Sequence, residues 1–376
     1  MGKRIALYDL TYPQLAELLT RWGEPRFRAD QVWRWLYRSR VAEFEAMENL
    51  PTALRIRLAA ETELHLLTPM ADQVSANGQT RKVLFRLRDG NTIESVLMSY
   101  HQRRSACLST QVGCGLGCVF CATGQGGLVR NLSAGEIVAQ AIHFAQEVDR
   151  ARGVQALERR THMLTSEHPI THIVLMGMGE PLANYEATWQ AIETLVDARG
   201  YHLGARRITL STVGLVPGIR RLAQESLPIN LAVSLHAPDD ELRNQLVPVN
   251  QRYPLRELLA AVGEYIQKTG RRVSFEYALI AGVNDSPAQA RRLAEQVRGL
   301  LCHVNVIPLN PTPGSSFRPS PRERVQAFCA ELEAAGIPTT IRMRRGIDIE
   351  AGCGQLRRRQ VDYPDSVAAV RKPDGG

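Results

Sequence analysis

The chain has 376 residues, of which 44% are hydrophobic and 22% are charged, so its composition excludes an intrinsically disordered protein. No stretch approaches the roughly 18 consecutive apolar residues of a membrane-spanning helix, and the first residues lack the apolar segment of a secretory signal. The surplus of 46 Lys and Arg over 38 Asp and Glu gives a net charge of +8, which favours a polyanionic partner. We expect a cytoplasmic monomer with no membrane partner.

The first part of the chain predicts a small helical accessory domain over residues 1–80. Apolar residues recur at helical spacing in Tyr12–Trp22, Arg28–Tyr37 and Thr52–Glu61, and Pro51 marks a boundary. This domain is a candidate RNA contact.

A β-hairpin is expected next, over residues 81–104. The β-rich runs Lys82–Leu87 and Thr92–Ser99 flank the turn-forming sequence Asp89-Gly90-Asn91. The hairpin would bridge the helical domain and the core.

From Ser105 onward, β-rich runs alternate with amphipathic stretches. This alternation argues for parallel strands joined by right-handed crossovers, and six units predict an α/β fold, a partial (β/α)6 barrel over residues 105–345. Sites in such folds gather at the carboxyl ends of the strands. The expected strands are Ala106–Ser109, Thr171–Met176, Arg207–Ser211, Ile229–Leu235, Val273–Leu279 and Val304–Leu309. The expected helices are Ala134–Val148, Tyr185–Val196, Gly218–Gln224, Leu255–Lys268, Ala288–Leu300 and Glu323–Ala335.

Three further segments lack a strong period. We interpret the polar, charged stretch Asp149–Pro169 as a surface insertion, residues 346–360 as a mobile loop that carries Cys353, and residues 361–376 as a disordered tail.

Three of the seven cysteines form the run Cys114-x3-Cys118-x2-Cys121 after an expected strand. Three thiolates on one tight loop can bind three irons of a cubic four-iron cluster and leave the fourth iron open for another ligand. The alternative is a structural zinc or a closed cluster with Cys107 as the fourth ligand, but zinc sites more often pair two short Cys units. This spacing is typical of the radical S-adenosylmethionine (SAM) superfamily, which the chain resembles here.

Polar residues follow several expected strands, where they would converge on a bound ligand. Gly177-Met178-Gly179-Glu180-Pro181 follows the strand that ends at Met176, so the glycines permit close backbone approach and Glu180 can meet a ligand ammonium. Each residue alone is more often a cap or a turn residue, and the repetition at four strand ends favours ligand binding. The expected cofactor-binding residues are Gly179, Glu180, Ser211, Ser234, Leu235, His236 and Asn310.

The combined motifs resemble the RlmN and Cfr methyltransferases, RlmN most closely, from about Phe27 to Leu356. The matching stretches are Ser109–Cys114, Cys118–Gly124, Arg130–Leu132, Met176–Leu182, Ser234–Ala237 and Ala351–Leu356. The resemblance implies a radical SAM barrel with one [4Fe-4S] cluster on Cys114, Cys118 and Cys121. It also implies methylation at C2 of adenine 2503 in 23S rRNA and at C2 of adenine 37 in some tRNAs; Cfr-like methylation at C8 is the alternative.

The same resemblance implies roles for three residues outside the cluster motif. Cys353 would accept a methyl group from one SAM, and a second SAM would yield the radical that activates that methyl group. Cys107 would then release the product by forming a transient disulfide with Cys353. Glu94 would accept the proton of the substrate carbon. A flavodoxin or ferredoxin would supply electrons.

Other interpretations stay open at this point. Cys107 and Cys353 could be inert core thiols, the reading we favour for Cys302 and Cys329. The chain could be a noncatalytic iron-sulfur protein that binds RNA, or a radical enzyme that acts on a small molecule or peptide. Basic clusters on both sides of Cys353 favour RNA as the partner; they contain Arg342, Arg344, Arg345, Arg357, Arg358 and Arg359.

Overall fold

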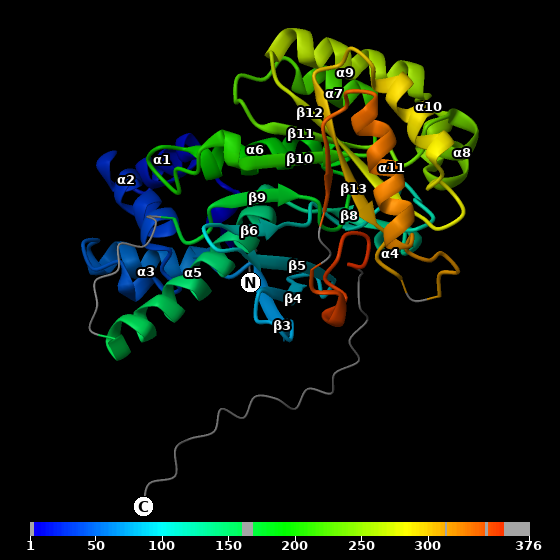
Figure 1. Ribbon diagram of the computed structural model, residues 1–376. Coiled ribbons are helices and arrows are strands. Elements are labelled where there is room, and N and C mark those ends of the chain that lie inside the picture. The colour runs from blue at the N-terminus through cyan, green and yellow to red at the C-terminus, as the bar shows by residue number, and fades with distance from the viewer. Residues whose placement is uncertain (1–3, 160–167, 313, 343–344, 357–376) are drawn as a thin grey trace, which may run out of the picture.

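The computed structural model describes residues 4–159, 168–312, 314–342 and 345–356. Within them, a ten-stranded sheet runs in the order β14-β13-β12-β11-β10-β9-β6-β5-β4-β3 and curves around an interior (Figure 1). Its parallel strands are β6 (Arg104–Cys107), β9 (His172–Leu175), β10 (Ile208–Thr212), β11 (Asn230–Ser234), β12 (Val273–Leu279), β13 (Cys302–Pro308) and β14 (Thr339–Ile341). Its antiparallel strands are β3 (Leu67–Val74), β4 (Thr80–Leu87) and β5 (Thr92–Ser99).

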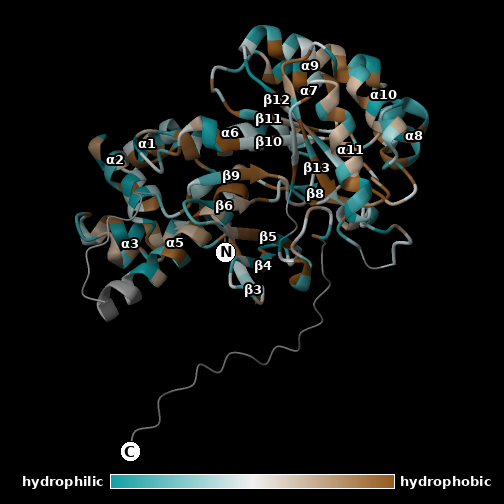
Figure 2. Cartoon of the chain, viewed as in Figure 1, coloured by the Kyte–Doolittle hydropathy of each residue, from teal (hydrophilic) through white to brown (hydrophobic). Residues whose placement is uncertain are grey.

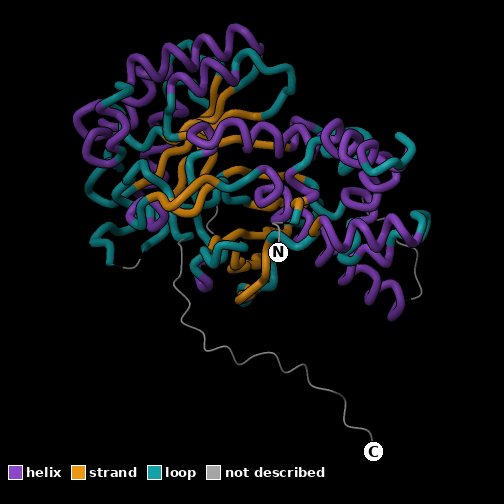
Figure 3. Tube along the Cα trace, turned by 180° about the vertical axis from the view of Figure 1, so that it is seen from behind, coloured by secondary structure: helices purple, strands orange, loops and turns teal. Residues whose placement is uncertain are grey.

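Helices cover the outside of the parallel strands, as a partial barrel requires, and the view from behind shows the same layering (Figure 3). The N-terminal helices are α1 (Tyr12–Arg21), α2 (Phe27–Arg34) and α3 (Thr52–Glu61). The helices that follow in the barrel are α4 (Ala122–Gln125), α5 (Ala134–Arg159), α6 (Tyr185–Val196), α7 (Val216–Leu222), α8 (Asp240–Leu246), α9 (Leu255–Thr269), α10 (Pro287–Val297) and α11 (Arg322–Ala334). Two small sheets pair β1 (Ile5–Ala6) with β2 (Thr62–Glu63) and β7 (Gln111–Gly113) with β8 (Leu128–Asn131).

The predicted partial barrel is confirmed. All six expected strands are present, with bounds that differ by up to two residues, and β14 adds a further parallel strand at the edge. The expected hairpin is also present as β4 and β5, whose register pairs Leu84 with Glu94. Local sequence explains several helix starts: Thr11 and Gln14 form a capping box at α1, and Ser286 and Gln289 form another at α10.

Two stretches differ from the expectation. The segment to about residue 80 was expected to be helical, yet Leu67–Val74 forms β3 and pairs with β4. The stretch from Asp149 was expected to be an irregular insertion, but α5 continues through Arg159. Residues 160–167 of that insertion and the whole expected tail lie outside the described residues. The predicted domain boundaries stay predictions.

The N-terminal helices share one hydrophobic core with the barrel. Trp33 and Tyr37 are buried in the same cluster of side chains as Ile173 and Leu210 of the parallel strands. Figure 2 shows both hydrophobic and hydrophilic residues along the helices of the two parts. Asp9 reaches the start of α5, where its Oδ1 accepts a hydrogen bond of 2.7 Å from the amide of Gly135. These contacts fix the helical segment against the first βα unit. Over the described part of the chain, no helix combines the length and apolarity that crossing a membrane requires.

Candidate active site

A cavity opens at the carboxyl ends of the parallel strands. We call it the strand-end cavity; Cys118, Cys121, Glu276, Arg342 and Cys353 line it. Six of the seven expected cofactor-binding residues also line it: Gly179, Glu180, Ser211, Ser234, His236 and Asn310. Leu235 differs, because its side chain is 1% exposed and lies in the hydrophobic core. Within the part of the chain that the structure describes, the buried Oδ1 of Asn310 has no hydrogen-bond partner, so it is available to a ligand.

The three expected metal ligands lie on the loop after β7. The amide of Cys114 donates to Gly127 O at 2.9 Å, which closes the loop against the start of β8. Gly113 has φ +80°, and a Cβ there would lie 1.9 Å from the same carbonyl oxygen, so this position requires glycine. Cys121 contributes to the raised pKa values of Cys114 and Cys118, so the three thiols lie near one another. Two of them, Cys118 and Cys121, line the strand-end cavity.

Burial is the main electrostatic influence on these thiols. It raises the pKa of Cys114 to about 11, and it also raises the pKa of Cys118. Such thiols become thiolates at neutral pH only beside a cation or metal centre. Among the described residues, no three His, Cys, Asp or Glu side chains converge on a point that would hold a single metal ion. The donor set fits a cluster that spreads its ligands over several irons.

Glu180 forms part of the cavity wall and also fixes two loops. Its Oε1 accepts from the amide of Leu182 at 3.0 Å, and its Oε2 accepts from the amide of Val213 at 2.9 Å. Burial raises the pKa of the Glu180 carboxyl to about 7, although these hydrogen bonds oppose the rise. A ligand ammonium would stabilise the carboxylate here, as expected from the sequence.

The glycines before Glu180 also allow close packing within the chain. A Cβ on Gly177 would lie 2.6 Å from Leu108 O, and one on Gly179 would lie 2.7 Å from the amide nitrogen of Gln111. They allow this loop to pack directly on the chain that leaves β6. Gly179 also lines the strand-end cavity.

His236 presents a neutral ring to the cavity. Burial, with a smaller contribution from the nearby Arg243, lowers its pKa to about 3. The amide of Ala278 donates to Nδ1 at 3.0 Å, so the proton of the neutral ring resides on Nε2. The ring packs edge to face against Phe120 of the cysteine loop, with centroids 4.8 Å apart. His236 is therefore a fixed hydrogen-bond donor.

Cys353 and Cys107 line a common cavity, which we call the thiol cavity; Val96, Tyr100 and Arg342 also line it. Cys353 is exposed, whereas Cys107 is buried at the end of β6, and both are free thiols. Burial and the nearby Cys353 raise the pKa of Cys107 to about 12, and Arg342 opposes this rise. The thiol and strand-end cavities share Cys353, so one sulfur faces both.

The loop that carries Cys353 is held in place by several contacts. Asn310 Nδ2 donates to Cys353 O at 3.2 Å, and the amide of Ala122 donates to Gly354 O at 2.8 Å. A Cβ on Gly352 would lie 2.6 Å from Cγ of Asn310, so glycine lets the loop approach. The loop includes a short 3-10 helix, Ile347–Ile349. Its expected mobility stays a prediction.

Glu94 lies on β5, outside the residues that line the two cavities described so far. Its side chain is 1% exposed, and its Oε1 lies 3.5 Å from Nζ of Lys82. Lys82 also donates to Glu350 O at 3.2 Å, which ties this pair to the Cys353 loop. Val96 lies two residues beyond Glu94, so both face the same side of the sheet, and Val96 lines the thiol cavity.

Two family models match the chain. The ribosomal RNA large subunit methyltransferase N-terminal domain matches residues 5–64, and the radical SAM superfamily matches residues 108–294. A protein of Chloroflexus aurantiacus, named probable dual-specificity RNA methyltransferase RlmN, is 54% identical over 359 residues, covering 94% of this chain and 93% of the relative. One of Roseiflexus castenholzii with the same name is 51% identical, covering 93% and 95%. A solved radical SAM methyltransferase from Sphaerobacter thermophilus superposes with a TM-score of 0.88 at 52% identity, covering 94% and 99%.

The chain belongs to the RlmN family of radical SAM methyltransferases. Membership decides against the noncatalytic RNA-binding protein, and it brings SAM and a [4Fe-4S] cluster as cofactors.

Sequence reasoning missed Arg243, a buried residue that supports the site of this RlmN-family chain. Its guanidinium donates to Leu235 O at 3.0 Å, to Val213 O at 2.5 Å and to Asn250 Oδ1 at 2.7 Å. It thereby joins the ends of β10 and β11, which carry Ser211 and Ser234. Burial lowers the pKa of Arg243 to about 10. Only its position in the helix after a cofactor-binding strand could have suggested this role.

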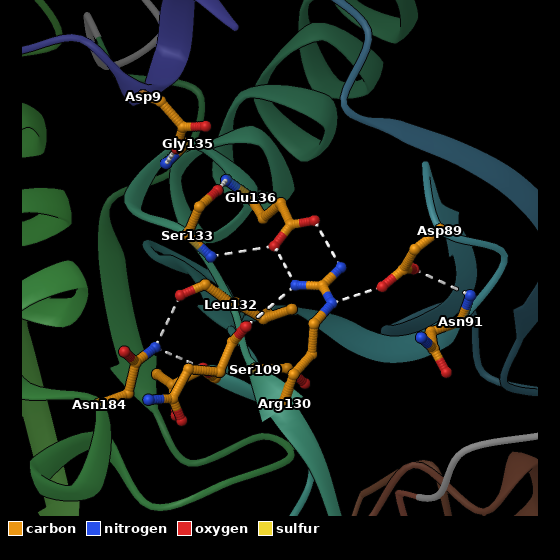
Figure 4. A network of polar contacts seen from close by, with 12 residues as sticks. Asp9, Asp89, Asn91, Ser109, Arg130, Leu132, Ser133, Gly135, Glu136 and Asn184 are labelled. Carbon is orange, nitrogen blue, oxygen red and sulfur yellow. Dashed lines mark hydrogen bonds and ion pairs between the residues drawn. The ribbon is translucent and has the colours of Figure 1, made fainter. Parts of the chain in front are cut away.

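Arg130, from the motif Arg130-Asn131-Leu132 that resembles the RlmN and Cfr methyltransferases, supports the cysteine loop from outside (Figure 4). Its guanidinium donates twice to Glu136 at the start of α5, at 2.7 and 2.8 Å, and once to Asp89 of the β4–β5 turn at 2.5 Å. The hydrogen bond from Arg130 is the main cause that lowers the pKa of Asp89 to about 2. Nearby, Asn184 Nδ2 donates to Thr110 O and Leu132 O, both at 2.8 Å. The network joins the hairpin, the β7–β8 ribbon and the barrel.

Proposed function

We propose that this chain methylates C2 of adenine 2503 in 23S rRNA, and C2 of adenine 37 in some tRNAs, through a methyl group carried on Cys353. The observation that carries the proposal is the position of Cys353, whose side chain lines both the strand-end cavity and the cavity that contains Cys107. A thiol so placed can accept a methyl group from a cofactor on one side and meet a base and a second thiol on the other. The names of the relatives support RNA as the substrate.

One [4Fe-4S] cluster would be held by Cys114, Cys118 and Cys121, and SAM by Gly179, Glu180, Ser211, Ser234, His236 and Asn310, with Leu235 contributing backbone only. When bound, this pair supplies a 5′-deoxyadenosyl radical, and two SAM molecules are consumed per turnover. Glu180 would pair with the SAM ammonium, and His236 would donate a hydrogen bond from Nε2. Burial of both residues excludes water from the radical.

The two thiols act in sequence. Cys353 attacks the SAM methyl as a thiolate and carries it as a thioether. When SAM and the cluster are bound, one hydrogen atom would pass from that methyl group to the SAM-derived radical and one electron to the cluster, so that the methyl carbon can bond to adenine while Glu94 accepts the proton from the substrate carbon. The Cys107 thiolate then attacks the Cys353 sulfur, which breaks its bond to carbon, forms a disulfide and leaves the electron pair on the product carbon for protonation to a methyl group. Cellular thiols reduce the disulfide before the next turnover.

A pair of variants tests these roles. Cys107→Ala should purify with RNA covalently attached to Cys353, because the second thiol is missing. Cys353→Ala should carry no RNA and transfer no methyl group. Protein mass spectrometry with nuclease treatment measures the adduct, and Cys302→Ala, a change at a buried thiol on β13, is the control. An adduct-free Cys107→Ala chain with normal turnover would refute the role of Cys107.

The position of the methyl group needs a separate measurement. Mass spectrometry of ribosomal and transfer RNA from a deletion strain should show loss of 2-methyladenosine, restored by this chain. Loss of 8-methyladenosine instead would assign the Cfr-like reaction. We further propose that the enzyme is monomeric and receives electrons from a flavodoxin or ferredoxin.

A further inference from the structure

The interior of the barrel below the strand-end cavity is polar and open. In closed barrels, branched aliphatic side chains fill this space. Here every second residue of several strands faces inward, and His172, Thr209, Ser274 and His303 in these positions are half-buried. They line a space of about 610 Å³, which we call the lower barrel cavity. Such a volume falls within the range of ligand pockets, roughly 300–1,000 Å³.

Positive charge dominates this cavity. Arg103, Arg207, Arg342 and Arg345 line it, and Glu276 is the carboxylate among its lining residues. Arg103 and Arg207 are exposed, so their guanidinium groups lie where solvent and ligand can reach them. Burial lowers the pKa of His172, and the charges of Arg103 and Arg207 lower it further. The positive charges of the two exposed arginines therefore act on the same residue of this cavity.

An aromatic ring holds part of this charge in place. The guanidinium carbons of Arg103 and Arg345 each lie 4.2 Å from the centroid of the Tyr100 ring, a cation–π geometry. Arg345 also donates to Gln79 Oε1 at 2.6 Å. Positioned arginines of this kind suit phosphate, because the planar guanidinium offers paired donors to its oxygens.

The lower barrel cavity adjoins the reacting thiols. It shares Tyr100, Met176, Arg342 and Arg345 with the thiol cavity. A base that reaches Cys353 must therefore have its sugar and phosphates close to this positive space. Single-stranded RNA loops present splayed bases with accessible backbones, whereas a stacked duplex base would not reach a thiol inside a barrel.

We propose that the lower barrel cavity binds the phosphodiester backbone of the RNA strand beside the target adenine, with Arg103 and Arg207 as phosphate contacts. This inference rests on the proposed function for the identity of the substrate and adds the path of the strand. The exposed arginines at the opening favour a continuous strand over a small enclosed anion.

The test compares two double variants of the full-length holoenzyme. Arg103→Gln with Arg207→Gln removes two charges from the cavity. Arg256→Gln with Arg298→Gln removes the same charge from exposed positions on α9 and after α10, outside the cavity. The probe is the 23S rRNA hairpin that contains the target adenine, and filter binding at several salt concentrations gives its Kd.

The cavity pair should weaken RNA binding roughly tenfold at 0.15 M salt and reduce the slope of log affinity against log salt by about 1.4, as expected for two single-strand phosphate contacts. The control pair should change each value far less, because salt screens distant charges. Arg103→Lys with Arg207→Lys should keep the slope, which shows that charge and not folding is responsible.

The outcomes separate this inference from the proposed function. Equal weakening by both Gln pairs, or no weakening by the cavity pair, would overturn the cavity as a phosphate site. A wild-type chain that never carries a methyl group on Cys353 after incubation with SAM would instead overturn the proposed function. Cys353 methylation is read by peptide mass spectrometry without RNA, so the two failures are distinguishable.

Discussion

The strand-end cavity and the lower barrel cavity, which we call the upper and lower halves of the barrel interior, differ in how their lining residues carry charge. In the strand-end cavity, burial raises the pKa of Glu180 to about 7 and lowers that of His236 to about 3, so both side chains are driven toward neutrality. In the lower barrel cavity, Arg103 and Arg207 are exposed. One fold therefore combines a chamber lined by buried titratable side chains with a second chamber lined by exposed basic ones.

The difference follows from what surrounds each half. Buried residues at four strand ends and Cys353 line the upper half, whereas arginines and half-buried polar side chains line the lower half. A chamber with buried polar groups suits radical chemistry, and a positive chamber suits a polyanion. Met176, Glu276 and Arg342 line both, so they form the boundary between the two.

The largest effect should come from removing a sulfur of the upper half. Cys118→Ala should abolish turnover and most bound iron, because one of three cluster ligands is lost. Cys107→Ala should keep the iron of the wild-type chain, since this thiol lines a different cavity. Iron and sulfide analysis of both variants gives the comparison. Equal loss of iron would make Cys107 a fourth ligand and the cluster a closed one.

The second largest effect should come from a change of pH, which acts on stability through His236 in the upper half. His236 has a folded pKa of about 3 against 6.5 when unfolded, so the folded chain binds fewer protons between these values. Stability is therefore full above pH 6.5 and is lost as the pH falls toward 3, by about 3 kcal/mol at pH 4.5. His236→Asn should lack this loss, because Asn accepts the Ala278 amide bond, tolerates φ +61° and does not titrate.

Urea unfolding of both chains, prepared without iron, measures the difference at pH 7.5 and 4.5. The wild type and His236→Asn share their other titrating groups, so only the His236 contribution separates their pH dependences. Parallel losses in the two chains would mean that the ring is not buried in neutral form.

Arg342, at the boundary between the halves, should have a smaller effect. Its guanidinium lowers the pKa of Cys107, and it lies 3.6 Å from Glu276 Oε2. Arg342→Gln should raise the pKa of Cys107 and slow the release of product from Cys353 roughly tenfold, a change equivalent to about one pKa unit. Single-turnover kinetics should show accumulated adduct and a rate that recovers as the pH rises. A pH-independent deficit would indicate a structural role alone.

Much of the upper half was predictable from sequence, because its residues stand next to easily recognised strands. Buried parallel strands are rich in apolar residues, and polar residues such as Ser211 and Ser234 stand at their carboxyl ends. The two strands at the edges of the sheet were harder to predict from the sequence. β3 is almost wholly exposed and contains Pro69, so it lacks the apolar alternation of a strand, and β14 has only three residues.

The lower half was not predicted, because it forms only where residues from distant parts of the sequence come together in the fold. His172 and His303 lie on different strands and Arg207 directly precedes a third, and nothing in their local sequence marks them as neighbours. Polar residues at every second position of the strands could have indicated this polar interior. In strands with both faces covered, however, such a pattern is hard to recognise from the sequence. Arg243 and Arg342 were missed as partners of the site for the same reason.

The smallest predicted effect concerns Arg130, which supports the upper half from outside. Arg130→Ala should lower the free energy of unfolding by about 1 kcal/mol, because the largely buried Glu136 loses its partner while solvent screens the contact with Asp89. Arg221→Ala breaks the exposed pair with Glu186 and should cost less. Because Arg130 lies outside the lower barrel cavity, Arg130→Ala should leave the salt slope of RNA binding intact while it destabilises the chain. A reduced slope would place Arg130 on the RNA path and extend the positive region beyond the lower half.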